Sequence, residues 1–212
     1  MKHLFTLFMF MLTLLQVGIS QSNVTKADNY FVQTKVGEKL NHFYAQEGNV
    51  QVYFHKDRIE MISEVDGEEQ YFFILLKNVS FDTPEGEGMV SKETVSIENL
   101  AMSNVLKSST MEMAYFNSIK YVDNVTGESV VISLKGNKIN FNGLGKIPLE
   151  LQLSGNAGLT TTRNQSVQLE EFGKIIELSS KNSQLAKDNN KISFQQGGGN
   201  EDTSLHLTIT II

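Results

Sequence analysis

The side chains best suited to acid–base or metal chemistry are three of the four histidines, His42, His55 and His206. A zinc site needs several converging ligands, and pairs such as His-x-His or His-x-x-x-His are its usual sequence signal. The three histidines are far apart in the sequence and form no such pair. His55 and His206 also alternate with apolar residues, which places them on the polar face of expected strands. We therefore expect no metal at the histidines.

Two short acidic segments carry the oxygen ligands that Ca²⁺ prefers. The first contains Asp82, Glu85 and Glu87, and the second contains Asp66, Glu68 and Glu69. Neither has the spacing of an EF-hand loop, and short acidic loops are ordinarily solvated. We therefore expect no metal and no cofactor in either segment.

The sequence lacks the arrangements that activate a nucleophile. It has no Gly-x-Ser-x-Gly, no Ser-x-x-Lys with its partner motifs, and no cysteine for a Cys–His pair. The two catalytic carboxylates of a glycosidase have no fixed spacing in the sequence. Sugars commonly stack on tryptophan in the clefts of such enzymes, however, and the chain has no tryptophan. We predict no catalytic residues and a protein that is not an enzyme, with a hydrolase using dispersed carboxylates as the weakest hypothesis.

The first twenty residues have the organisation of a secretory signal. Lys2 is followed by an apolar stretch over Leu4–Leu15, and small residues stand at Gly18 and Ser20. This pattern predicts a signal peptide over residues 1–20 and cleavage between Ser20 and Gln21. The apolar stretch is too short for a transmembrane helix of about 20 residues. We expect an exported, periplasmic or extracellular protein with no transmembrane span in the mature chain.

Composition narrows the class of protein further. Without Lys2, 17 of the 18 Lys and Arg residues remain against 24 Asp and Glu, so the mature chain has a net charge of −7. An acidic chain without a basic cluster is not expected to bind nucleic acid.

The absence of cysteine favours a bacterial envelope over an animal secretion. Asn-x-Ser/Thr sequons occur at Asn23, Asn78, Asn124 and Asn164, about as many as chance produces in such a sequence.

Alternation of apolar and polar residues dominates residues 49–212 and predicts half-buried strands. Val50, Val52 and Phe54 show it near the start, and Leu205–Ile211 shows it at the end. Asp66-Gly67 predicts a hairpin turn, and Thr83–Gly88 predicts a loop. The fold class we predict is all-β, a single β-sandwich-like domain of about ten strands.

Residues 21–48 are expected to form an N-terminal lead-in to this domain. Val32, Val36, Leu40 and Phe43 stand at near-helical spacing. The segment 28–44 therefore predicts either a short amphipathic helix or a loosely ordered lead-in.

Several segments resemble a known family. They are Phe43–Asn49, Ser103–Val105, Tyr115, Tyr121–Asp123, Ile147–Leu159, Val167–Ile175, Asn190–Phe194 and Leu205–Leu207. Together they resemble the β-rich N-terminal domain that precedes SBBP-type β-propeller repeats in exported, gliding-motility-associated bacterial proteins. The family's Pro-Gly-Ala-Asp turn is replaced by Gly143–Lys146, and no propeller repeats follow. The resemblance implies a surface or envelope β-module and no catalytic residue.

These observations support two main hypotheses. The first is an exported, non-enzymatic module that contacts an envelope or cell-surface protein. The second is a periplasmic carrier of a lipid or another apolar ligand, because Tyr71–Leu76 is a continuous apolar run and methionine suits adaptable cavities. An elongated apolar cavity would favour the carrier.

Overall fold

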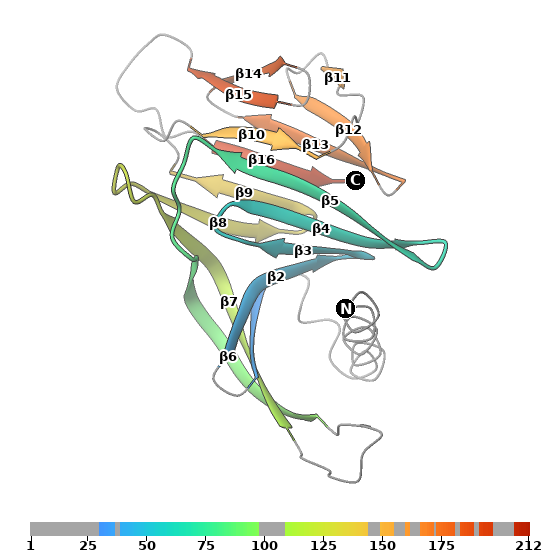
Figure 1. Ribbon diagram of the computed structural model, residues 1–212, viewed down its shortest axis with the longest axis vertical. Helices are drawn as coiled ribbons and strands as arrows, with labels where there is room; N and C mark the ends of the chain where they lie inside the picture. Colours follow the sequence, from blue (N-terminus) through green and yellow to red (C-terminus); the bar gives the residue numbers. More distant parts are fainter. Residues whose placement is uncertain are drawn as a thin grey trace, which may run out of the picture.

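The computed structural model describes residues 30–36, 39–97, 109–143, 149–154, 160–161, 166–171, 173–180, 183–188, 191–196 and 206–212. All of its regular elements are strands, and all sixteen belong to one antiparallel sheet (Figure 1). The strands are β1 (Phe31–Val36), β2 (Lys39–Glu47), β3 (Val50–Phe54), β4 (Arg58–Val65), β5 (Glu68–Lys77), β6 (Glu85–Ile97), β7 (Ser109–Val122), β8 (Ser129–Lys135), β9 (Lys138–Asn142), β10 (Glu150–Leu153), β11 (Thr160–Thr161), β12 (Val167–Glu171), β13 (Lys174–Ser180), β14 (Ser183–Asp188), β15 (Lys191–Gln196) and β16 (His206–Ile211).

The prediction of an all-β fold is confirmed, but the sheet is one continuous curled surface, and its sixteen described strands exceed the ten expected. Asp66-Gly67 forms the predicted turn between β4 and β5, with φ angles of 54° and 80°. Positive φ at both turn residues matches the right-handed twist of a hairpin. The signal peptide and its cleavage site lie outside the described residues.

The prediction of a helix within the lead-in is wrong for its described part, which forms the hairpin of β1 and β2. Phe31 and Val32 are both buried, and the pairing register shifts between Gln33 and Lys35. This irregularity interrupts the period-two pattern, so the apolar residues fall at near-helical spacing by coincidence. The hairpin pairing continues to Val36, which pairs with Lys39.

The long strand β7 organises the sheet. Its residues 111–116 pair with β1 and its residues 118–122 pair with β8, while β6 pairs along both stretches. Because a strand has only two edges, β1 and β8 must share the edge opposite β6. Two arms therefore leave the same edge of β7, one in the order β1-β2-β3-β4-β5-β10-β15-β14 and the other in the order β8-β9-β16-β13-β12-β11.

The hydrophobic core joins the two arms. Leu76 from β5 and Val130, Ile132 and Phe141 from β8 and β9 line one small pocket together with Tyr121 of β7. Buried residues of both arms belong to a single cluster, which includes fully buried aromatic and aliphatic side chains from most strands. Each such side chain contributes about 1.5–3 kcal/mol to stability. The core therefore holds the curled sheet closed.

Candidate functional site

The free edge of β6 is the most distinctive surface of the described chain. Among the described residues, β6 pairs with β7 alone, although it is thirteen residues long (Figure 1). An unpaired edge presents backbone N–H and C=O groups that can accept another strand. The predicted loop over Thr83–Gly88 is therefore partly wrong, because β6 already begins at Glu85.

Apolar side chains are exposed at the middle of this edge. Met89 is 61% exposed and Val90 is 48% exposed. The β6–β7 register shifts between Met89 and Ser91, which leaves Val90 without a partner on β7. Gly88 just before it has a φ of +64°, a conformation that favours glycine. The bulge interrupts the edge and displays two apolar side chains to solvent.

The N-terminal half of β6 is anchored to the core through Gly86. A Cβ atom at Gly86 would lie 2.4–2.7 Å from ring carbons of Phe116. Phe116 in turn packs edge-on against Phe43, with ring centroids 5.5 Å apart. Glycine is therefore required at position 86, because the aromatic ring occupies the space of a side chain.

Charges flank the exposed apolar residues. Glu85 and Glu87 precede them, and Lys92 follows them with its Nζ 2.8 Å from Glu112 Oε2 on β7. The hydrogen bond from Lys92, together with its charge, lowers the pKa of Glu112. The positive charge of Lys92 is thus matched within the hairpin, and the N-terminal half of the edge remains acidic.

A second polar cluster surrounds His55, at the end of β3. The His55 Nε2 lies 2.9 Å from Glu60 Oε2, and the His42 ring lies 4.2 Å from the His55 ring, centroid to centroid. Arg58 Nη2 lies 3.8 Å from the same Glu60 oxygen. Burial, the nearby His42 and the charge of Arg58 lower the pKa of His55, and they outweigh the opposing effect of Glu60.

Sequence reasoning placed His55 on a solvated face, whereas it is only 8% exposed. His42 is exposed beside it, and His206 lies far along the sheet, in β16 opposite Asn142. Within the described ranges, no group of three His, Cys, Asp or Glu residues is arranged to hold a metal ion.

The two acidic segments have separate structural partners. Asp82 Oδ1 accepts a hydrogen bond of 2.9 Å from Asn124 Nδ2. Glu69 accepts one from the Tyr71 hydroxyl, and Asp66 occupies the β4–β5 turn. These contacts organise turns and strand ends.

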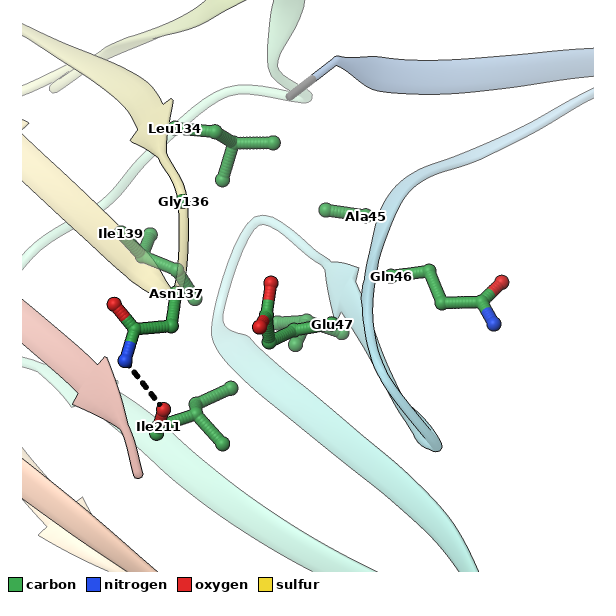
Figure 2. A pocket seen from close by; sticks show the side chains of 9 residues that line it. Ala45, Gln46, Glu47, Leu134, Gly136, Asn137, Ile139 and Ile211 are labelled. Carbon is green, nitrogen blue, oxygen red and sulfur yellow. Dashed lines mark hydrogen bonds between the residues drawn. The ribbon is translucent and has the colours of Figure 1, made fainter. Parts of the chain in front are cut away.

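Neither of the two best-formed pockets of the described chain resembles the cavity of a carrier. The first lies between the β2–β3 and β8–β9 hairpins and is open to solvent, so that its empty volume of about 280 Å³ is largely not enclosed. In Figure 2, Ala45 and Glu47 face Leu134, Ile139 and Asn137 across it. The Asn137 side chain donates a 2.9 Å hydrogen bond to the Ile211 carbonyl and so closes one wall (Figure 2). The enclosed space in either pocket holds about one water molecule, far less than the roughly 300–1,000 Å³ of a small-ligand pocket.

The apolar run Tyr71–Leu76 is a core strand with one inward face. Phe72, Ile74 and Leu76 are buried, while Tyr71 is 44% exposed. The run therefore supplies side chains to the core between the arms.

Comparisons with known proteins give no match to a protein family, a curated protein or a solved structure. No helix in the described part of the chain has the length and apolar character needed to cross a membrane.

Sequence reasoning missed the β6 edge, since an edge is defined by long-range pairing. The sequence signal that could have suggested it is the pair of glycines at 86 and 88, which are unfavourable in a central strand.

Proposed function

We propose that the protein is an exported, non-enzymatic module whose two arms pack in a sandwich-like way and which binds another envelope or cell-surface protein through β6. The observation that carries this proposal is the open β6 edge with Met89 and Val90 exposed on it. Strand addition at a sheet edge derives affinity from main-chain hydrogen bonds and specificity from side-chain contacts.

The charge of the edge defines the chemistry of the partner. Glu85 and Glu87 are acidic, and Lys92 is matched by Glu112. An extended partner segment with aliphatic residues at its centre and Lys or Arg toward one end would complement this arrangement. The bulge at Met89–Ser91 limits regular pairing to one side of it, so the partner strand is short.

The carrier of a lipid or another apolar ligand is the alternative. It draws on the apolar strand and the methionine content, and it requires a larger cavity than the two described pockets provide. The contact module requires no cavity, which is why we favour it. The resemblance to domains that precede SBBP-type repeats agrees with an envelope role.

Export has its own test. Mass spectrometry of the protein recovered from outside the cytoplasm should give a chain that begins at Gln21. A mature form that retains residues 1–15 would contradict the export part of the proposal and leave the contact at β6 to be judged separately.

Contact at β6 is tested by photo-cross-linking in cells that produce the protein. A benzoyl-phenylalanine at position 90 should form an adduct with a basic, extended segment of one partner, identified by mass spectrometry of the cross-linked peptide. The same probe at Val125, which is 80% exposed on a turn, is the matched control.

Met89→Lys should abolish the adduct from position 90, because it places a charge against the aliphatic centre of the partner segment and a like charge near its basic end. Equal labelling from positions 90 and 125, no adduct at position 90, or an adduct insensitive to Met89→Lys would each refute contact at this edge.

A further inference from the structure

Hydrogen bonds tie the turn between β3 and β4 to β5 and β7 at a titratable site. The Tyr121 hydroxyl of β7 donates a 3.0 Å hydrogen bond to the His55 carbonyl oxygen. The His55 N–H in turn donates to the Arg58 carbonyl at 2.9 Å, and the Leu76 N–H of β5 donates to the Asp57 carbonyl at 2.9 Å. One short turn thus links β3, β4, β5 and β7.

Five ionisable side chains lie close to the His55 ring or next to a residue that does. His42 lies on β2, Arg58 and Glu60 lie on β4, and Asp57 in the turn has its Oδ1 3.3 Å from Arg58 Nη1. Lys56 in the turn is exposed. Among the described residues, Glu60 is the carboxylate within hydrogen-bond distance of the His55 ring, at 2.9 Å. Because an ionised carboxylate only accepts hydrogen bonds, Nε2 of His55 carries the proton that Glu60 binds.

We propose that the cluster of His42, His55 and Glu60 is an acid-sensitive latch that holds the β3–β4 turn against β7. At neutral pH, His55 is uncharged and Nε2–H donates to Glu60. Acid adds a proton from solvent to Nδ1, so that a buried imidazolium lies beside Arg58 and within 4.2 Å of the His42 ring. The charged ring then shares the Glu60 carboxylate with Arg58, whose Nη2 lies 3.8 Å from the same oxygen, so that two like charges lie close together in a buried site.

The direction of the effect follows from linkage. Burial, His42 and Arg58 lower the pKa of His55 in the folded protein, so the unfolded chain binds the proton more readily. Stability from the latch is fully present above the ordinary histidine pKa of about 6.5 and is lost as the pH falls toward the lowered pKa. The turn therefore loosens in mildly acidic surroundings, independently of any partner at β6.

Hydrogen–deuterium exchange at pH 7.5 and pH 5.5 tests the latch, after correction for the intrinsic pH dependence of exchange. Residues 54–58 should open roughly three- to tenfold more readily at the lower pH. His55→Gln keeps a donor for Glu60 but cannot gain charge, so it should remove this difference. His206→Gln is the matched control and should preserve it.

An NMR titration of the wild-type imidazoles provides a test that needs no variant. The His55 ring should titrate below about 6.5, and the amide signals of Phe54–Arg58 should move with it. A His55 pKa at or above the ordinary value, or an acid effect that persists in His55→Gln, would overturn the latch.

Discussion

The Tyr121 hydroxyl donates a 3.0 Å hydrogen bond to the backbone carbonyl of His55, and this bond joins β7, from which both arms leave, to the β3–β4 turn of the arm that begins with β1. Tyr121 is only 1% exposed, and burial raises the pKa of its hydroxyl well above the ordinary value. The phenol is therefore a permanent donor at every physiological pH. Its ring also packs against Phe81, with centroids 5.2 Å apart.

We expect Tyr121→Phe to lower the free energy of unfolding by about 1–3 kcal/mol. The substitution keeps the ring contact with Phe81 and leaves the His55 carbonyl without its buried donor. Urea denaturation measures the change. Tyr71→Phe is the control, because Tyr71 is 44% exposed and should change stability by no more than about 0.5 kcal/mol. Equal effects of the two substitutions would mean that the hydrogen bond between Tyr121 and the His55 carbonyl contributes nothing to stability.

Gly86→Ala should destabilise the protein by roughly 1–3 kcal/mol, because the new methyl group would meet the Phe116 ring at 2.4–2.7 Å. A double-mutant cycle with Phe116→Leu checks the cause. If the ring is responsible, alanine at position 86 costs less in the Phe116→Leu background. Additive effects of the two substitutions would show that Gly86 is needed for another reason.

The Asp123 carboxylate organises the loop between β7 and β8. It accepts hydrogen bonds from the Ser80 N–H at 2.8 Å and from the Thr126 N–H and hydroxyl at 2.9 and 2.8 Å. Burial by itself would raise the pKa of Asp123, but these bonds, with one from the Val125 N–H, lower it below the ordinary value.

The stability that Asp123 provides is present at neutral pH and is lost as the pH falls below about 3.9 toward the lowered pKa. We expect Asp123→Asn to destabilise the protein by about 1–3 kcal/mol at pH 7, since an amide has only one oxygen to accept the four bonds. The variant should also lose less stability between pH 4 and pH 2 than the wild type. Thermal unfolding across this range measures both effects, and an unchanged acid response would contradict the role of Asp123.

Local patterns predicted the strands well where one face is buried. The alternation of Val50, Val52 and Phe54 corresponds to buried residues of β3, and Asp66-Gly67 forms the expected turn. The hairpin of β1 and β2 was missed because the register shift after Gln33 disturbs the alternation. Local signals fail there, since a bulge adds a residue to only one strand of a pair.

Long-range pairing was beyond the reach of sequence patterns. Ile119 pairs with Ile132 of β8, and Phe116 pairs with Phe31 of β1, so one strand serves both arms. The pairing of Phe116 with Phe31 has no local signal, because several strands separate the two residues in the sequence. The pairing of Ile119 with Ile132 is local by comparison, because a short turn joins β7 and β8. The exposed edge at Val90 depends on these long-range pairings and could not be derived from spacing. The contact of His55 with His42 instead continues the register of the local β2–β3 hairpin, in which Phe43 pairs with Phe54, and it was missed because residues 28–44 were expected to be helical or loosely ordered.

The C-terminal strand β16 lies inside the sheet, between β13 and β9. Its predicted burial is confirmed for Leu207 and Ile209, each 0% exposed, and for Ile211 at 4%; Leu205 lies outside the described residues. Deletion of residues 205–212 would expose the edges of both neighbouring strands and remove three core side chains. We therefore expect the truncated protein to be insoluble or unfolded.

A point substitution in β16 tests the contribution of its core side chains separately from that of its strand pairing. Ile209→Ala should cost about 2–5 kcal/mol, because it leaves a cavity between the arms. Thr210→Ala, on the opposite face of the same strand, should change stability by no more than about 0.5 kcal/mol. Chemical denaturation compares the two variants with the wild type. If the truncated protein melts cooperatively at the wild-type temperature, β16 is peripheral to the fold, and its place between β13 and β9 contributes no stability.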